Sequence, residues 1–268
     1  MDNYFVSSCK RVKDWICRQF GQKEKKTVHH KKFADGGEVI VWETGRAGEE
    51  AASYENLFLR KEIAGFRTNI RREQSCSIKS LTRDYLYKQL LSSGEYTFDH
   101  MLVIKDPYGE APLTALALFI LEEPACVRVT TKGNLKETDF VTELPKKKEH
   151  RVPILGMYAE KANDIVIEIL DDEGNCVKSH TFTIRTKRLP KSLRNVITVK
   201  KRTDKPAYSN IMINGGVKIH TCVFDIEGKI RYYLSRKPRG YGIFPLSDGH
   251  FFYMEKYISV PSYSNPQT

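Results

Sequence analysis

Histidines are the residues of this sequence best suited to acid–base or nucleophilic chemistry, because imidazole ionises near neutral pH. The chain holds seven of them: His29, His30, His100, His150, His180, His220 and His250. Past residue 90 they occur singly, mostly within or beside expected strands, where a lone histidine is more often structural than catalytic. His220 and His250 fall in the C-terminal segment and are the strongest catalytic candidates of the set.

Metal binding finds little support in the spacing of ligands. The His29–His30 pair could bind a metal, but it lies in a basic tract without other ligands nearby, so a solvated pair is favoured. Asp171, Asp172 and Glu173 could coordinate a hard cation, although a hairpin turn explains them more simply. The six cysteines contain no CxxC pair, which argues against a zinc site and a disulfide framework: Cys9, Cys17, Cys76, Cys126, Cys176 and Cys222.

Nucleotide and hydrolase motifs are also missing. The glycine pairs in GGEV and NGGVK lack the spacing of either phosphate-binding motif, and HExxH, GxSxG and the kinase motifs do not occur. We therefore expect no cofactor and no metal, and motifs alone name no catalytic residue.

The net charge of +11 and the pI of about 9.2 leave three interpretations open. They are an ordinary lysine-rich surface, attraction to anionic small molecules or an acidic partner, and nucleic-acid binding, for which no signature motif is present. The charge is concentrated in residues 185–205, which hold nine basic residues and a single acidic one, Asp204. This run is either a solvated inter-domain connector or a strip that faces an anion or a partner.

The N-terminal sequence MDNYFVSSCKRVKDWICRQF is not a signal peptide as written, because charged residues interrupt its apolar positions. No stretch approaches the roughly 18 apolar residues of a membrane-spanning helix. We therefore expect a cytoplasmic protein with no membrane partner, and we expect no nucleic-acid partner.

Two periodicities divide the chain. EVIVWE (38–43) alternates like a strand, and helical spacing of apolar residues predicts helices over 49–70 and 80–91. From residue 96 onward, short apolar or alternating runs predict about seven strands: 96–104, 113–120, 126–131, 139–144, 150–158, 164–170 and 179–186. Turn-forming segments separate them, including PKKKE (145–149) and DDEGN (171–175). This pattern predicts an immunoglobulin-like antiparallel β-sandwich.

The remaining residues predict two hairpins. Segments 217–235 and 243–254 each read as strand, turn and strand, which together amount to about one blade of a β-propeller. The expected domains are then a basic, partly helical region (1–95), a β-sandwich (96–186), a basic linker (187–210) and the first blade of a truncated propeller (211–268).

Four segments carry ordered motifs. DPYGEAPLTALALF (106–119) is similar to N-P-Y-x-x-A-P-L-T-A, with Asp106 in place of Asn, and residues 150–169 are similar to I-P-V-x-G-L-Y-x-x-x-x-N-x-V. CVFDIEGKIRYYL (222–234) is similar to I-I-D-x-x-G-x-V-R-W-Y, and SDGHFFYM (247–254) to the strand that follows it. In this order, the segments resemble the arylsulfate sulfotransferase family over about residues 100–255.

The resemblance implies an enzyme that does not need PAPS and moves a sulfuryl group from a phenolic sulfate ester to a phenol through a sulfurylated histidine. It also implies an N-terminal β-sandwich that assists homodimerisation, a six-bladed propeller with a central active site, and relatives that are often periplasmic. The family's catalytic histidines and arginine lie in later blades, and none of them matches a position here. We therefore expect a chain that lacks the catalytic residues; the alternative is a non-enzymatic β-sandwich that dimerises or binds a partner.

Overall fold

The protein is described from a computed structural model, which places residues 28–33, 36–55, 73–201, 210–213, 220–235, 242–245 and 251–254. The two helices of these segments are α2 (Thr44–Ala52) and α4 (Glu73–Ser92). The strands of the main sheet are β1 (Val28–Lys32), β2 (Glu38–Trp42), β3 (His100–Lys105), β4 (Ala115–Thr131), β5 (Phe140–Ile154), β6 (Ala162–Leu170) and β7 (Cys176–Arg185). The C-terminal strands are β8 (Asn210–Ile213), β9 (Cys222–Asp225), β10 (Ile230–Tyr233), β11 (Gly242–Pro245) and β12 (Phe251–Met254).

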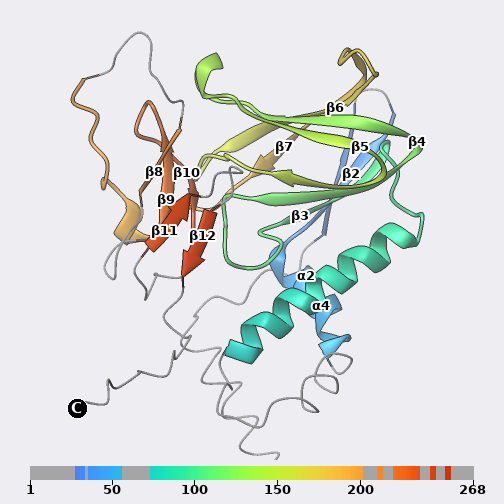
Figure 1. Ribbon diagram of the computed structural model, residues 1–268, viewed down its shortest axis with the longest axis horizontal. Helices are drawn as coiled ribbons and strands as arrows, with labels where there is room; N and C mark the ends of the chain where they lie inside the picture. Colours follow the sequence, from blue (N-terminus) through green and yellow to red (C-terminus); the bar gives the residue numbers. More distant parts are fainter. Residues whose placement is uncertain are drawn as a thin grey trace, which may run out of the picture.

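The main sheet has the strand order β1-β2-β3-β4-β6-β7, and β5 pairs with β4 (Figure 1). Strands β4 and β5 are long enough to belong to both layers of a sandwich. The first half of β4 pairs with β3, whereas its second half pairs with β6, and β5 accompanies it throughout. Every pairing in this sheet is antiparallel except β2 with β3. The expected immunoglobulin-like sandwich is confirmed.

Two expected strand pairs prove to be single strands. Residues 113–120 and 126–131 merge into β4, and 139–144 and 150–158 merge into β5, so the break expected at PKKKE (145–149) is wrong. The physical reason is that pairing continues through Ala125 and Lys147, with register shifts on either side of Ala125. Such β-bulges bend a strand without ending it.

The sandwich layers enclose the larger of two apolar cores. On β3, Met101 and Val103 face this core, whereas the alternating Leu102 and Ile104 pack against the helices. All four side chains are fully buried, which explains why β3 reads as a continuous apolar run.

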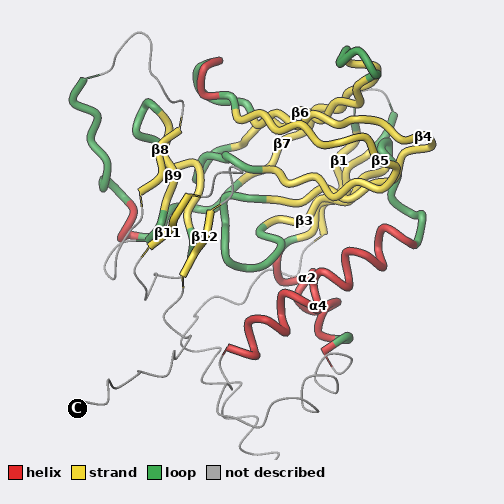
Figure 2. The backbone as a smooth tube through the Cα atoms, in the orientation of Figure 1, coloured by secondary structure: helices red, strands yellow, loops and turns green. Residues whose placement is uncertain are grey.

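The helices cover the outer face of the sheet (Figure 2). Leu86, Tyr87 and Leu91 of α4 pack there with Ala47 and Ala51 of α2. The helix expected over 80–91 is confirmed within α4. Of the helix expected over 49–70, residues up to 52 belong to α2, and residues 56–72 lie outside the described part of the chain.

The sheet runs across residue 95, where the sequence placed a domain boundary. Strand β2 pairs in parallel with β3 over Glu38–Trp42 and His100–Ile104. Parallel neighbours need a crossover connection, and the segment that contains α2 and α4 provides it. Residues 28–95 therefore contribute strands to the same sheet as the sandwich.

The C-terminal strands form two small sheets, β10-β9-β8 and β11-β12, which contain the two hairpins expected from the sequence. Strand β8 was not expected. In the β9–β10 turn, Gly228 adopts a φ of +74°, a conformation that glycine reaches at little cost. The propeller assignment of these hairpins stays a prediction.

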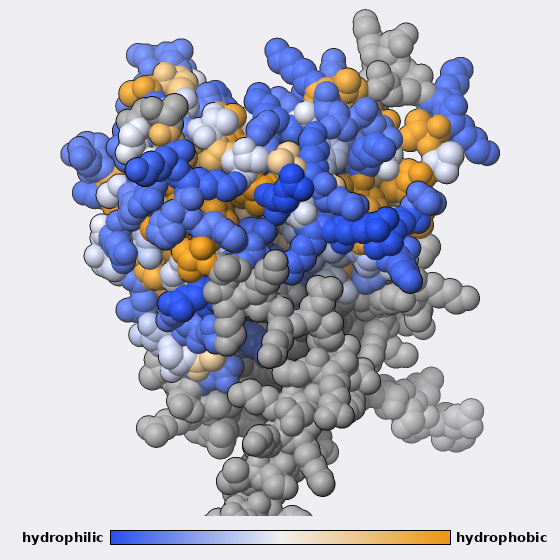
Figure 3. Space-filling model, turned by 180° about the vertical axis from the view of Figure 1, so that it is seen from behind, coloured by the Kyte–Doolittle hydropathy of each residue, from blue (hydrophilic) through white to orange (hydrophobic). Residues whose placement is uncertain are grey.

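The exposed surface of the described segments is mainly hydrophilic on the face in Figure 3, with separate apolar patches. Among the described residues, no helix is long and apolar enough to cross a membrane.

Candidate functional site

The histidines of β1 and β3 lie beside carboxylates on the surface. His29 Nε2 is 3.7 Å from Glu43 Oε1, whereas His30 Nδ1 is 3.4 Å from Glu38 Oε2. His100 Nδ1 is 3.0 Å from the other oxygen of Glu38. The described residues contain no group of three or more His, Cys, Asp or Glu side chains that could hold a metal ion. Both imidazoles of the His29–His30 pair are thus more than half exposed, and each lies beside one carboxylate.

The histidines of β5 and β7 are buried in the sandwich. His150 Nε2 is 2.8 Å from the carbonyl oxygen of Lys147, and burial lowers the pKa of this imidazole. The His180 ring stacks on Phe33 and Phe98, with centroids 4.0 and 4.6 Å away, and its Nε2 is 2.8 Å from a carboxylate oxygen of Asp99. Both imidazoles are thus held by packing and hydrogen bonds, as structural histidines are.

Of the two C-terminal candidates, the structure describes His220 alone. His220 is buried, and its Nδ1 is 2.8 Å from the carbonyl oxygen of Leu234. His250 lies outside the described residues. The acidic run at 171–173 forms a turn: Asp171 Oδ1 accepts hydrogen bonds from the backbone N–H groups of Glu173 and Asn175.

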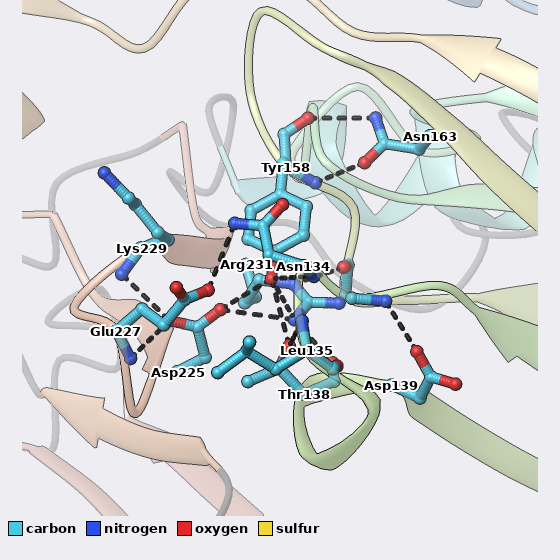
Figure 4. A network of polar contacts seen from close by, with 12 residues as sticks. Asn134, Leu135, Thr138, Asp139, Tyr158, Asn163, Asp225, Glu227, Lys229 and Arg231 are labelled. Atoms are coloured by element: carbon cyan, nitrogen blue, oxygen red, sulfur yellow. Dashed lines mark hydrogen bonds and ion pairs between the residues drawn. The ribbon is translucent and has the colours of Figure 1, made fainter.

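The most extensive buried polar arrangement lies where the β9–β10 hairpin meets the sandwich (Figure 4). We call it the junction network and define it by Thr138, Gly156, Tyr158, Asn163, Asp225 and Arg231. Its residues come from the β4–β5 connection, the β5–β6 connection and strand β6 on the sandwich side, and from β9 and β10 on the other.

Arg231 is the centre of the network. Its Nε donates to the carbonyl oxygen of Gly156 at 2.6 Å, and its Nη1 donates to that of Thr138 at 2.6 Å and to the Tyr158 hydroxyl at 3.0 Å. The side chain is fully buried, and Nη2 has no hydrogen-bond partner. A register shift between Ile230 and Tyr232 surrounds Arg231, and bulges of this kind re-aim side chains.

Asp225 connects the network to the hairpin turn. Its Oδ1 accepts hydrogen bonds from the backbone N–H groups of Glu227 and Lys229, each at 3.0 Å. Its Oδ2 accepts from the Tyr158 hydroxyl at 2.8 Å and lies 3.3 Å from Arg231 Nη1. One carboxylate therefore fixes the turn and neutralises the buried guanidinium.

Tyr158 joins the hairpin to the sandwich. The Arg231 guanidinium carbon lies 4.0 Å from the centroid of its ring, which adds a cation–π contact to the hydrogen bond. Asn163 holds the Tyr158 backbone by accepting from its N–H at 2.7 Å and donating to its carbonyl at 3.0 Å. Burial raises the pKa of the Tyr158 phenol, which therefore stays protonated and able to donate.

A second attachment lies at the other end of the hairpin, in the loop between β3 and β4. The backbone N–H of Ser235 donates to the carbonyl of Glu110 at 2.7 Å. In the same loop, Asp106 has a φ of +44°, a conformation that Asn and Asp tolerate better than most residues, and its Oδ1 accepts from the N–H of Ala111 at 2.9 Å. The replacement of Asn by Asp106 thus preserves both the backbone conformation and the acceptor.

Two shallow hollows of the described surface lie between α4 and β5. The larger has a volume of about 440 Å³, is mostly open, and is lined by residues that include Asp84, Lys88 and Arg151. Arg151 Nη2 donates to Asp84 Oδ1 at 2.6 Å, so these charges already satisfy each other. Arg151 also lines the smaller hollow together with His150, whose Nε2 lies 2.8 Å from the carbonyl oxygen of Lys147.

The junction network was not predicted from the sequence as a unit. Yet Gly156, Tyr158, Asn163, Asp225 and Arg231 all occupy named positions of the motifs at 150–169 and 222–234. Two motifs separated by more than fifty residues therefore meet in space. The network is closed to solvent at Arg231 and Asp225, so it can orient elements but cannot bind a substrate.

One family model matches the chain. Residues 102–187 match the model described as the arylsulfotransferase Ig-like domain. No curated protein matches the chain.

Proposed function

Because residues 102–187 match the Ig-like domain of the arylsulfotransferase family, we propose that the chain is the N-terminal part of a PAPS-independent arylsulfate sulfotransferase. In this proposal, phenolic sulfate esters donate the sulfuryl group and phenols accept it through a sulfurylated histidine. In the same proposal, this histidine belongs to later blades of the propeller. The chain itself provides the domain that holds the first propeller strands.

The observation that carries the proposal is the junction network. It ties β9 and β10, the strands proposed to begin the propeller, to the Ig-like domain through the buried Asp225, Arg231 and Tyr158. A buried polar network specifies one geometry, because any other orientation would leave its charges without partners. Such a device suits a domain that must hold a catalytic neighbour in a fixed position.

The described histidines support a non-catalytic role for this part of the enzyme. Nucleophilic attack on a sulfate ester requires an accessible imidazole, together with cationic groups that neutralise the sulfuryl oxygens. His150, His180 and His220 are buried, whereas the exposed His29 and His30 and the half-buried His100 lie beside carboxylates.

Two measurements test the proposal. The chain alone, given a chromogenic phenyl sulfate and a phenol acceptor, should release no phenol and should acquire no sulfuryl mass on histidine. The same chain should co-purify with a propeller from the arylsulfotransferase family expressed without its own Ig-like domain, and Arg231→Gln should weaken that association. Turnover by the chain alone, or no association with the propeller, would contradict it.

A second candidate is a non-enzymatic binding or dimerisation module. It is favoured by the two apolar cores, which are built largely from residues 33–193 and so need few residues of the C-terminal strands. Homodimerisation can be measured by light scattering. The β5 edge is a poor surface for strand pairing between copies, because Pro145 and the exposed Lys146, Lys147 and Lys148 protect it.

A further inference from the structure

The basic segment that begins at the last residue of β7 and runs toward β8 is a distinct surface feature, which we call the basic strip (residues 185–201). It holds seven basic residues and no acidic one, so it supplies seven of the chain's eleven net positive charges. These residues are Arg185, Lys187, Arg188, Lys191, Arg194, Lys200 and Lys201. The excess charge of the protein is therefore localised.

The basic strip is held against the body of the protein by apolar residues spaced four apart. Leu193 is 1% exposed and belongs to the main core, and Leu189 and Ile197 pack against that core. Beyond them, Val199 lies close to the β9–β10 turn: a Cβ placed on Gly228 would come within 2.8 Å of it. The strip is thus an anchored surface, in contrast to the solvated connector that was one sequence-based interpretation.

Most of the positive charges on the strip have no acidic partner among the residues that the structure describes. Arg188 lies 3.4 Å from Glu160, but both side chains are more than 60% exposed, so water and salt screen this pair. Arg194 Nε donates to the carbonyl oxygen of Leu189 at 2.9 Å. The other five basic side chains are exposed and form no ion pair with described residues: Arg185, Lys187, Lys191, Lys200 and Lys201.

The strip also exposes apolar side chains among its charges. Val196 and Val199 are 40% and 44% exposed, and they lie beside Arg194, Lys200 and Lys201 in the sequence. The segment contains no aromatic residue on which a nucleic-acid base could stack. This combination fits the interface of an anionic bilayer, where cations meet lipid headgroups and small apolar side chains enter the acyl boundary.

We propose that the basic strip is a peripheral docking surface for anionic phospholipid bilayers. Each Lys or Arg near such a surface strengthens binding by roughly fivefold, and an anchored backbone loses little conformational entropy on binding. No membrane partner was expected from the sequence, because no apolar stretch is long enough to span a bilayer, but peripheral docking does not need a spanning segment. This inference is independent of the sulfotransferase proposal.

The test is co-sedimentation of the full chain with vesicles of phosphatidylcholine alone or with added phosphatidylglycerol. Binding should require phosphatidylglycerol and should fall steeply as salt is raised. The triple variant Lys191→Gln, Lys200→Gln, Lys201→Gln should lose about a hundredfold in binding. Val196→Ser with Val199→Ser should weaken binding and leave its salt dependence unchanged.

The matched control is Lys146→Gln, Lys147→Gln, Lys148→Gln on β5, which removes the same charge from exposed positions elsewhere. Unchanged far-ultraviolet circular dichroism and melting temperature establish that each variant folds. The proposal fails if both triple variants lose binding equally, if the chain does not bind anionic vesicles, or if a short DNA duplex displaces it from them at equal charge concentration.

Discussion

The guanidinium of Arg231 and the carboxylate of Asp225 form an ion pair in which neither side chain is exposed to solvent. Removing two charges from water is costly, and backbone groups offset part of that cost by donating to the Asp225 carboxylate and by accepting from Nε and Nη1 of Arg231. Breaking the pair on one side therefore has consequences different from those of breaking an exposed pair.

Replacing Arg231 with Gln should destabilise the protein by about 3–5 kcal/mol, because the Asp225 carboxylate would stay buried without a counter-charge. Urea unfolding followed by circular dichroism measures this loss.

The control for this experiment is Arg128→Gln on the surface. Arg128 Nε lies 2.7 Å from Glu143 Oε1, but the two side chains are 29% and 60% exposed. Loss of this ion pair should lower the free energy of unfolding by less than about 1 kcal/mol. Equal small effects at Arg231 and Arg128 would mean that the junction network does not stabilise the fold.

Tyr158→Phe should cost about 1–3 kcal/mol, because it removes a hydroxyl that bonds to Asp225, Arg231 and the backbone N–H of Asn134. The informative measurement is a double-mutant cycle with Arg231→Gln. The two changes should be non-additive by at least about 0.5 kcal/mol, since they act on one network. Strict additivity would show that Tyr158 and Arg231 stabilise the protein separately.

The sheet was largely predictable because its residues are locally consistent. The apolar run of β3, the alternation of β2 and the glycine in the DDEGN turn each specify one structure. The continuity of β5 was not predictable, because Pro145 and the three lysines that follow it resemble a turn. Pairing with β4 outweighs that local preference, and only the tertiary structure reveals it.

The burial of Arg231 was also not predictable from the sequence. A single arginine in the strand IRYY is expected to point to solvent, since charged residues are seldom buried without a partner. Its partners Thr138, Gly156 and Tyr158 are 73 or more residues away in sequence. The signal that could have found the network was that separate motifs hold Gly156, Tyr158, Asp225 and Arg231.

Gly156→Ala should destabilise the protein far more than Gly174→Ala. Both glycines have positive φ, +75° and +86°, so both substitutions carry left-handed strain of about 1–2 kcal/mol. At Gly156 the new Cβ would also lie 2.6 Å from Phe140 Cβ and would displace the carbonyl that accepts from Arg231, whereas at Gly174 nothing lies within 4 Å. Similar melting temperatures for the two variants would contradict the close approach.

His150 should make the protein less stable at mildly acidic pH. Burial lowers its pKa in the folded state, so as the pH falls below the ordinary value of about 6.5, the unfolded chain binds a proton that the folded chain does not. This contribution to stability is complete above that value and decreases as the pH falls toward the folded pKa. His150→Gln should flatten the decline in unfolding free energy between about pH 7 and 5. An unchanged slope would mean that His150 does not cause this decline.

Tyr233 should make the protein less stable at alkaline pH. Burial, and then the negative charge of Asp106, raise the pKa of Tyr233 to about 12. An unfolded tyrosine ionises near 10, so between these values the unfolded chain releases a proton that the folded chain retains, and stability decreases as the pH rises. Tyr233→Phe should reduce the decline in unfolding free energy from about pH 9 to 11, and Asp106→Asn should reduce it less. If the unfolding free energies of Tyr233→Phe and of the parent protein instead decline in parallel, the phenol of Tyr233 is not the group that burial protects. The explanation to test next is the ionisation of Tyr108, whose pKa is also raised to about 12.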